Sequence, residues 1–378
     1  MALRYGFLST HPPTACGLAT FNAALAGHLI GDGTSSGIVR VTAKGDDLRP
    51  VPGVVHTWHA SDLGGWRDAV DVLDAYDVAV VQHEYGIYPG RDGEDVLPLL
   101  RRLTVPAVVV LHTVLSHPTP AQKSLLEQIV ATAAAVVTMT ETARDRLLIG
   151  YAVEAAKISV IPHGAADHSA EPARRSARPH LLTWGLLGPG KGVEWALRAL
   201  AQLRDLDPQP TYTVAGRTHP KVVERDGEAY RANLHRLGAE LGVAHSVNYQ
   251  AGFQDPGTLS RLIRSADVVV LPYDSREQVT SGVLIEAVAA GIPVVATCFP
   301  HAVEVLTDGP GILVPHRDPK ALAKAIRRIL TKPGLATSLA RPAAADLRWP
   351  AVAARYDALA GRLVQEHARI VDTAPAPA

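Results

Sequence analysis

Short apolar runs rich in β-branched residues alternate with longer segments of helical periodicity through most of this 378-residue chain. Runs such as 78–82, 106–111 and 293–296 are almost continuously apolar, which is typical of strands that are covered on both faces of a parallel sheet. Regular strand–helix alternation of this kind predicts doubly wound parallel sheets of the α/β class.

The same pattern gives the extent of each element. We expect strands at 3–8, 38–43, 78–82, 106–111, 135–139, 158–161, 181–185, 211–215, 247–250, 267–272, 293–296 and 311–314. We expect helices at 17–30, 65–75, 93–102, 120–132, 141–149, 192–205, 226–242, 256–265, 282–290, 319–330 and 350–368.

The alternation is interrupted once, by a polar and proline-containing stretch between residues 165 and 180 that has neither period. Such composition is typical of a linker, and it divides the chain into two α/β halves of similar size. The last helical stretch, 350–368, is not followed by a strand, so we expect it to pack back on the first half. The expected organisation is a first domain over 1–165, a linker over 166–180, a second domain over 181–345 and a disordered tail over 369–378.

The charge balance argues against nucleic acid as the main partner. Lys and Arg number 37, as do Asp and Glu, whereas proteins that grip a polyanion normally carry a basic excess. Two cysteines, Cys16 and Cys298, are too few for a disulfide framework and fit a reducing cytoplasm. No apolar run approaches the ~18 residues that span a bilayer, and no signal peptide is visible. We therefore expect a cytoplasmic protein, for which peripheral membrane contact stays open.

Ligands of open parallel sheets bind beyond the carboxyl ends of the strands, so the residues that follow each strand are the candidate site. In the first half, Gly17 opens the helix after the first strand, where a helix N-terminus is able to face an anion. His83 and His112 follow two neighbouring strands, and imidazole suits hydrogen bonding to polyhydroxyl ligands as well as proton handling. The plainer interpretations are an ordinary turn for Gly17 and satisfied core residues for the two histidines.

A glycine-rich loop, Gly185-Leu-Leu-Gly-Pro-Gly-Lys-Gly192, follows the first strand of the second half. It nearly matches the phosphate-binding pattern GxxxxGK[ST], but Gly192 stands where the hydroxyl that coordinates Mg²⁺ belongs. Gly190 and Lys191 therefore suit a diphosphate that is bound without being attacked at phosphorus. The plainer interpretation is a turn with a solvated lysine.

The richest group of polar residues follows the strand 267–272. There a helix begins near Ser281 and Gly282, and its unpaired N–H groups form a candidate anion site together with the hydroxyls of Thr280 and Ser281. Glu286 lies one turn further into this otherwise apolar helix, where a buried carboxylate is costly unless something hydrogen-bonds it. A ribose diol would do so, as in dinucleotide-binding folds, whereas the plainer interpretation is an exposed glutamate.

These motifs resemble those of the retaining family 4 glycosyltransferases, the glycogen-synthase-like group with the two-domain GT-B fold. The resemblance covers nearly the whole chain and is carried by PPTACGLATF at 12–21, His112, Ile161-Pro-His-Gly164, the GLLGPGKG loop, Val214-Ala-Gly-Arg217 and EAVAAGIPVV at 286–295. It implies two doubly wound Rossmann-like domains that face a central cleft, with the acceptor on the first and the nucleotide sugar on the second.

The resemblance further implies an enzyme that moves a hexose from a nucleoside-diphosphate sugar to an acceptor hydroxyl with retention of configuration. The catalytic candidates are His83, His112, Lys191 and Gln278. The donor-binding candidates are Gly17, Gly190, Lys191, Arg217, Glu277, Gln278, Thr280, Ser281, Gly282, Val283 and Glu286. No cofactor and no metal ion is implied, and the HExxH spacing and Cys/His clusters of metal sites are absent from the sequence.

Three positions depart from the family pattern, and one of them is His163, which stands where asparagine is usual. Gln278 lies eight residues before Glu286, where the family usually has a second glutamate, and Glu277 is one place off. Leu186 stands where arginine is common, so Arg217 is a candidate for the missing positive charge. These departures leave the identity of the donor sugar open.

Three alternatives also stay open, of which a sugar-nucleotide epimerase on the same two-domain plan is the lesser one. The GxxxxGK match favours a P-loop-like NTPase or kinase that would depend on Mg²⁺, although Gly192 speaks against it. Gln278 and Leu186 favour a sugar-nucleotide-binding protein without transferase activity. The fold alone does not separate these functions, because function depends on the site.

Overall fold

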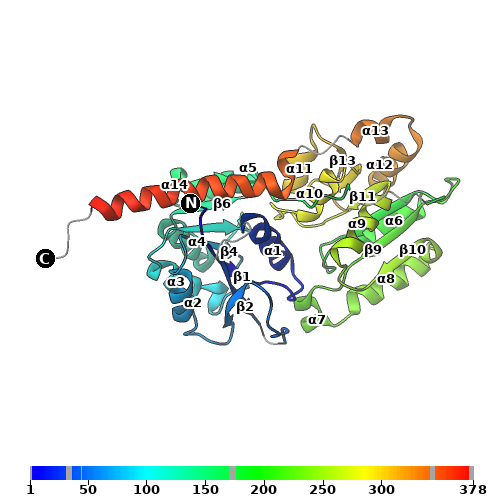
Figure 1. Cartoon of the computed structure of the whole chain (residues 1–378). Helices are drawn as coiled ribbons and strands as arrows, with labels where there is room; N and C mark the ends of the chain where they lie inside the picture. The colour runs from blue at the N-terminus through cyan, green and yellow to red at the C-terminus, as the bar shows by residue number, and fades with distance from the viewer. Residues whose placement is uncertain (1, 31–35, 44, 170–175, 341–344, 374–378) are drawn as a thin grey trace. The chain divides into compact units, whose positions relative to one another are not determined.

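The computed structural model describes residues 2–30, 36–43, 45–169, 176–340 and 345–373 (Figure 1). The chain forms two compact units. Unit 1 comprises Met1–Gly164 and Trp349–Ala378, and unit 2 comprises Ala165–Arg348. Each unit is an α/β sheet of parallel strands, which confirms the predicted fold class of two Rossmann-like domains.

The described part of unit 1 is built on a seven-stranded parallel sheet with the order β3-β2-β1-β4-β5-β6-β7. Its strands are β1 (Tyr5–Ser9), β2 (Gly37–Thr42), β3 (Val54–His59), β4 (Val78–His83), β5 (Ala107–Leu111), β6 (Ala135–Thr138) and β7 (Ile158–Val160). Its helices are α1 (Gly17–Leu29), α2 (Trp66–Leu73), α3 (Val96–Arg102), α4 (Pro120–Thr132), α5 (Glu141–Gly150) and α14 (Trp349–Thr373), with the short turns η1 (Arg91–Gly93) and η2 (Ala155–Lys157).

Helices α1 and α14 cover one face of this sheet, although α14 is the last helix of the chain (Figure 1). The rings of Phe21 in α1 and Trp349 in α14 meet edge to face with their centroids 5.1 Å apart. The Tyr5 hydroxyl donates a hydrogen bond of 2.5 Å to the Asp357 carboxylate. A Cβ on Gly164 would lie 2.3 Å from the Trp349 ring, so the last residue of the first segment needs to be glycine. The two segments of unit 1 therefore share one core.

The described part of unit 2 is built on a six-stranded parallel sheet with the order β10-β9-β8-β11-β12-β13. Its strands are β8 (His180–Trp184), β9 (Thr211–Ala215), β10 (Val247–Gln250), β11 (Val268–Leu271), β12 (Val294–Thr297) and β13 (Gly311–Val314). Its helices are α6 (Val193–Ala201), α7 (Pro220–Asp226), α8 (Ala229–Glu240), α9 (Pro256–Ser265), α10 (Gly282–Ala289), α11 (Pro300–Leu306), α12 (Pro319–Thr331) and α13 (Leu335–Leu339), with the short turns η3 (Ala244–Ser246) and η4 (Ala345–Leu347).

Successive residues of each central strand in unit 2 enter different cores. On β8, Leu181 packs with residues of α6, α8 and α12, whereas the next residue, Leu182, packs with residues of α9, α10 and α11. Both leucines are at most 2% exposed. Because helices cover both faces of the sheet, strands such as β11 (VVVL) and β12 (VVAT) contain almost no polar residue, which is the pattern from which they were predicted.

The strand order reverses once in each sheet, between β1 and β4 in unit 1 and between β8 and β11 in unit 2. Connections on the two sides of such a switch point diverge, and the strand ends there leave room for a ligand. In unit 2 the glycine-rich loop follows β8, and the segment 272–281 follows β11. The fold thus brings the two most polar motifs of the second half to one position.

Several elements differ from the sequence prediction. Strand β3, which contains His56 and His59, is absent from the expected strands; it lies at the sheet edge, and its residues are mostly exposed or half-buried. The expected helix 226–242 corresponds to α8, which begins only at Ala229, because Gly227, with a φ of 59°, ends the preceding helix α7, which was not expected. Helices α7, α11 and α13 are too short to show a clear periodicity.

The expected linker and tail are also partly ordered. Residues 166–169 of the expected linker 166–180 belong to unit 2, where His168 is buried, and β8 already begins at His180. Helix α14 continues to Thr373, so residues 369–373 of the expected disordered tail are helical. The rest of the expected tail, 374–378, lies outside the described residues, as does 170–175 of the linker.

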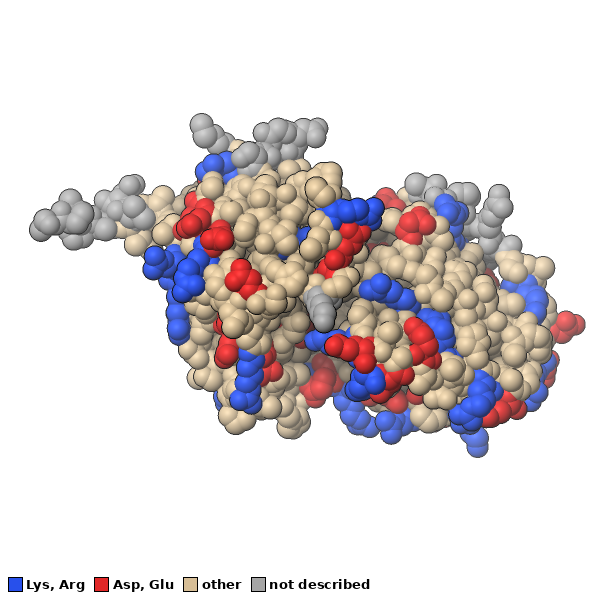
Figure 2. Space-filling model, turned by 90° about the horizontal axis from the view of Figure 1, so that it is seen from below, with Lys and Arg blue, Asp and Glu red and all other residues tan. Residues whose placement is uncertain are grey.

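The surface reflects the neutral composition. On the face seen in Figure 2, basic and acidic side chains are interspersed. Exposed ion pairs among the described residues include Arg327–Asp205 and Arg4–Asp77, each at 2.7 Å. None of the described helices has the length and apolar character needed to cross a membrane.

We expect Trp349→Ala to lower the free energy of unfolding by about 3–5 kcal/mol, because the substitution leaves a large cavity between α14 and α1. The matched control is Gly361→Ala in the same helix, where a Cβ would meet nothing within 4 Å. Alanine has the higher helix propensity, so this variant is expected to gain about 0.5–1 kcal/mol. Urea denaturation measures both changes. A loss of less than about 1 kcal/mol for Trp349→Ala would contradict a shared core.

Candidate functional site

The glycine-rich loop Gly185–Gly192 connects β8 to α6 at the switch point of unit 2. Gly190 and Gly192 have φ values of 91° and 66°, which favour glycine. A Cβ on Gly192 would lie 1.8 Å from the carbonyl oxygen of Pro272, at the end of β11. Only glycine lets the loop pass so close to this strand end. The hydroxyl group that a P-loop uses to coordinate Mg²⁺ therefore has no room at this position.

A main-chain hydrogen bond ties this loop to the segment after β11, since the Asp274 N–H donates to the Gly190 carbonyl at 2.9 Å. Lys191 follows, with Nζ 4.4 Å from the centroid of the Tyr273 ring. Burial lowers the pKa of Lys191 to about 8. The ring face favours the charged form, and a bound anion would favour it further. Lys191 is thus a cation that a phosphate would stabilise.

The loop after β9 runs beside the glycine-rich loop. The Leu187 N–H donates to the Arg217 carbonyl at 2.9 Å, and Leu187 forms a parallel bridge with Thr218. A Cβ on Gly216 would lie 2.0 Å from the Gly185 carbonyl oxygen, so the two backbones approach closely. This arrangement places Arg217, a half-buried residue, next to the loop that contains Lys191.

The N-terminus of α10 is held by two hydrogen bonds. The Ser281 hydroxyl accepts from the Leu284 N–H at 3.3 Å, and the Ser281 N–H donates to Nδ1 of His301 at 2.7 Å. Gly282 and Val283, the first residues of the helix, are half-buried. The first N–H groups of a helix have no acceptor within it, so this end of α10 is able to bind an anion.

The loop before α10 contains Glu277, Gln278 and Thr280, all half-buried. The side-chain amide of Gln278 donates to the Thr280 carbonyl at 3.0 Å. The Thr280 hydroxyl oxygen is buried and has no hydrogen-bond partner among the described residues. A glutamate at position 278 would lack this donor, so the conformation of the loop itself favours the amide that departs from the family pattern.

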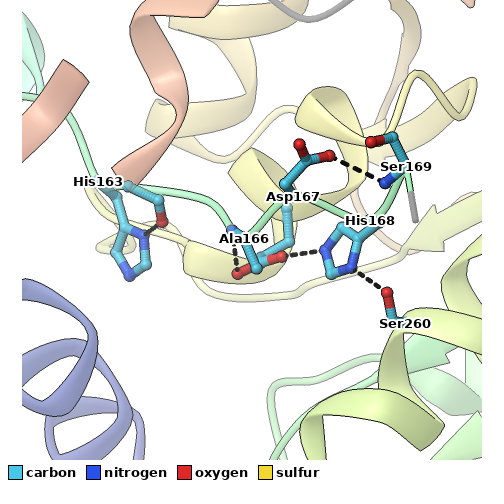
Figure 3. A network of polar contacts seen from close by, with 8 residues as sticks. His163, Ala166, Asp167, His168, Ser169 and Ser260 are labelled. Carbon is cyan, nitrogen blue, oxygen red and sulfur yellow. Dashed lines mark hydrogen bonds and ion pairs between the residues drawn. The ribbon is translucent and has the colours of Figure 1, made fainter. Parts of the chain in front are cut away.

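Glu286 lies on α10 with a side chain 19% exposed. Figure 3 shows its surroundings: the Ala166 N–H donates to Oε1 at 3.3 Å, and Nε2 of His168 bonds to Oε2. Nδ1 of the same histidine lies 2.8 Å from the Ser260 hydroxyl on α9. The sequence analysis expected a ligand to supply the hydrogen bonds of this carboxylate, whereas two of them come from unit 2 itself. Lone pairs remain on both oxygens for a further donor.

In unit 1, Gly17 begins α1 near the end of β1, and nothing lies within 4 Å of where its Cβ would be. Its neighbour Cys16 caps the helix by accepting the Ala19 N–H at 3.4 Å through Sγ. The backbone at Gly17 is therefore accessible to a ligand.

The two histidines of unit 1 differ in their environment. Nε2 of His112, a half-buried residue, donates to Oε1 of Gln82 at 2.8 Å. His83 is fully buried, and neither of its ring nitrogens has a hydrogen-bond partner among the described residues. Burial lowers the pKa of His112 to about 3 and that of His83 to about 4. Both rings are neutral at pH 7, which favours a hydrogen-bonding role for His112 over proton transfer.

Two family models match the chain. Glycosyltransferase Family 4 matches residues 17–168, and Glycosyl transferases group 1 matches residues 166–346. The chain belongs to this glycosyltransferase family. It is 30% identical to an alpha-D-kanosaminyltransferase from Streptomyces kanamyceticus over 280 residues, which cover 68% of each chain.

Another relative is a D-inositol 3-phosphate glycosyltransferase from Streptomyces bingchenggensis, 31% identical over 272 residues that cover 64% of this chain and 58% of that protein. Among solved structures, sucrose-phosphate synthase from Thermosynechococcus elongatus has a TM-score of 0.73 at 21% identity, over 96% of this chain and 100% of that chain. Anabaena HepE, in complex with UDP and glucose, has a TM-score of 0.67 at 16% identity, over 98% and 100%. At such identities the structural likeness speaks for the shared GT-B fold alone.

Two residues of this candidate site are not among those predicted from the sequence. Tyr273 packs under Lys191, and its hydroxyl contacts Ser281, so it connects the loop to the start of α10. Its place directly after β11 is a signal that could have found it. His168 lies in the expected linker, 118 residues before Glu286, and no local pattern indicates their contact.

We expect Lys191 to titrate near pH 8 in the free protein, well below the ordinary value of 10.5, and to titrate at higher pH when inorganic pyrophosphate is bound. Burial disfavours the charged amine, whereas the anion favours it, so binding shifts the pKa upward. NMR titration of ¹³C-methylated lysines measures this, and Lys191→Arg identifies the signal. A Lys191 signal that titrates near pH 10.5 and does not shift when pyrophosphate is added would contradict the expected anion site.

Proposed function

We propose that this family member moves a hexose from a nucleoside-diphosphate sugar to an acceptor hydroxyl with retention of anomeric configuration. The proposal rests on the switch point of unit 2. There the loop that contains Lys191 follows β8, and the segment that leads to α10 and Glu286 follows the adjacent strand β11. Together they match the parts of a nucleoside diphosphate, since cations and N–H groups suit phosphates and a carboxylate suits a ribose diol.

The donor-binding roles follow from this match. We assign the diphosphate to Gly190, Lys191 and the helix start Thr280–Val283, with Arg217 as a second cation. We assign the ribose to Glu286, whose two oxygens each keep acceptor capacity. The unpartnered Thr280 hydroxyl supports the assignment, because a buried hydroxyl normally has a partner and a phosphate oxygen would provide one.

The remaining candidates are assigned for each unit by itself. In unit 1 we assign Gly17 and His112 to the transferred sugar and the acceptor, whereas the buried His83 supports them from the interior. In unit 2 we assign Gln278 to a sugar hydroxyl through its amide oxygen, because its amide nitrogen is already bonded to the Thr280 carbonyl. Glu277 lies in the same loop and is the second candidate for this contact.

Catalysis in this proposal depends on charge stabilisation. As the bond to the sugar breaks, negative charge grows on the diphosphate and positive charge on an oxocarbenium-like ring, so fixed N–H groups and Lys191 stabilise the leaving group. The departing phosphate takes the proton of the acceptor hydroxyl, and the sugar is transferred on the face from which the diphosphate leaves. This route uses no protein nucleophile and no metal ion.

The comparisons support the nucleotide-sugar donor. HepE was crystallised with UDP and glucose, and the relatives are named for transfer of kanosamine and for D-inositol 3-phosphate. The chain aligns with 58% of the length of one of these relatives, so their substrates serve only as a guide. A kinase or NTPase is not favoured, because the backbone of Pro272 fills the place of the Mg²⁺-binding hydroxyl beside Gly192.

Donor binding and stereochemistry test the proposal directly. Among UDP, GDP and ADP, we expect one nucleotide and its glucose or mannose derivative to raise Tm by several degrees, since a ligand that binds only the folded state stabilises it. NMR of the product from that α-linked donor should show an α linkage. A β linkage would overturn retention, and binding without consumption of the donor in the presence of an acceptor panel would support a binding protein instead.

We expect transfer activity to survive EDTA. Among the described residues, no group of three or more His, Cys, Asp or Glu side chains is arranged to hold a metal ion. Positive charge at the diphosphate comes from Lys191 in our proposal, so removal of divalent ions should change the initial rate by less than about twofold. Loss of activity with EDTA and recovery with Mg²⁺ or Mn²⁺ would show that the leaving group needs a metal.

A further inference from the structure

A buried histidine outside the predicted site contacts the candidate ribose carboxylate. His168 is 5% exposed and lies in the connector segment 165–169, at the start of unit 2. Its Nε2 bonds to Oε2 of Glu286, and its Nδ1 lies 2.8 Å from the hydroxyl of Ser260 (Figure 3). The Ala166 N–H reaches the other carboxylate oxygen at 3.3 Å. The Glu286 carboxylate therefore links the connector to α10. The ring of His168 extends this link to α9 through Ser260.

The chemistry of these groups fixes the direction of the hydrogen bond between His168 and Glu286. Carboxylate oxygens only accept, so Nε2 of His168 carries a hydrogen and donates to Glu286. A hydroxyl both donates and accepts, so Ser260 is able to bond Nδ1 whether or not that nitrogen is protonated. The ring therefore presents the same donor to Glu286 in both protonation states, and it acts as a fixed support.

The arrangement leaves the carboxylate suited to a vicinal diol. Each oxygen of Glu286 receives one donor from the protein, from Ala166 and from His168, and so keeps a further acceptor direction. A ribose offers two adjacent hydroxyl donors. Holding the long glutamate side chain in one rotamer before binding lowers the entropy lost when the ligand arrives.

We propose that His168 is a positioning residue that holds the Glu286 carboxylate in the orientation that receives the ribose diol. The inference rests on the proposed function, in which Glu286 binds ribose. In this role His168 does not touch the ligand. Removing it should weaken the recognition of the two ribose hydroxyls and leave the diphosphate contacts intact.

A purely structural role does not explain why His168 contacts Glu286. The connector is already anchored by the Ala165 N–H, which donates to the Leu347 carbonyl at 2.8 Å, and by the ion pair of Asp167 with Arg348 at 2.8 Å. Neither of these bonds involves Glu286. Attaching the connector therefore does not require a buried imidazole aimed at that carboxylate.

The test compares two ligands that differ only in the diol. We take the nucleoside diphosphate among UDP, GDP and ADP that binds most tightly, and its 2′,3′-dideoxy analogue, and measure both Kd values by calorimetry. Hydrogen bonds to a charged group predict a preference for the ribose form of roughly 10- to 100-fold in the unmodified protein. We expect His168→Leu to reduce this preference to less than about threefold, with the Kd for inorganic pyrophosphate changed less than about twofold.

Two further variants keep the test decisive. His168→Gln retains an N–H donor close to the position of Nε2, so it should restore most of the preference. Asp167→Asn is the matched control in the same connector, because it removes an exposed ion pair without touching Glu286, and it should leave the preference unchanged. If His168→Leu does not fold, Ser260→Ala replaces it, since a less constrained ring should lower the preference about threefold.

The outcomes separate this inference from the proposed function. If the unmodified protein shows no preference for ribose, or if Glu286→Gln keeps it, the assignment of Glu286 to ribose is wrong. If Glu286→Gln loses the preference while a folded His168→Leu keeps it, the positioning role of His168 is overturned. An equal loss of affinity for the ribose and dideoxy ligands in His168→Leu would show a general structural role and would overturn it as well.

Discussion

The close approach of Gly192 to the Pro272 carbonyl is the constraint on which the unit 2 site depends. It presses the loop after β8 against the end of β11, at the point where the strand order reverses, and the hydrogen bond from Asp274 to Gly190 keeps it there. Lys191 is thereby held over the Tyr273 ring. The packing that builds the candidate phosphate site also excludes a side chain at position 192. The resemblance to a P-loop and the missing metal-binding hydroxyl therefore have one structural cause.

The second constraint is the cost of a carboxylate within an apolar helix. Leu284, Ile285, Ala287 and Val288 of α10 are all buried, and Glu286 among them is able to remain partly buried because it is hydrogen-bonded. Donors from the connector supply those bonds. The first residues after Gly164 are thus part of the unit 2 site, although their composition is that of a linker. A carboxylate with two donors is still able to bind a ligand, since two donors do not exhaust its acceptor capacity.

The sequence predicts the sheets well because their central strands are buried on both faces. Each of the twelve expected strands occurs within about two residues of its predicted ends. Strand β3 escaped prediction because an edge strand, half exposed and containing His56 and His59, lacks that apolar signature. Candidate residues at strand ends, such as Lys191 and Ser281, were predicted from the sequence. The contact of His168 with Glu286 was not, because it joins residues 118 apart, and only the folded chain brings them together.

Burial gives the ionisable groups of the two units different functions. In unit 1 burial keeps His112 and His83 neutral at pH 7, so these rings are able to offer hydrogen bonds and shape but no charge. In unit 2 burial lowers the pKa of Lys191, because the ammonium group loses hydration that the Tyr273 ring only partly replaces. The same loss of hydration strengthens the attraction of this ammonium group to an anion, since charges interact more strongly where water is excluded. A leaving diphosphate would stabilise the charged amine of Lys191, and this stabilisation would increase as negative charge grows on the diphosphate. The site that destabilises the free cation is therefore suited to stabilise the transition state.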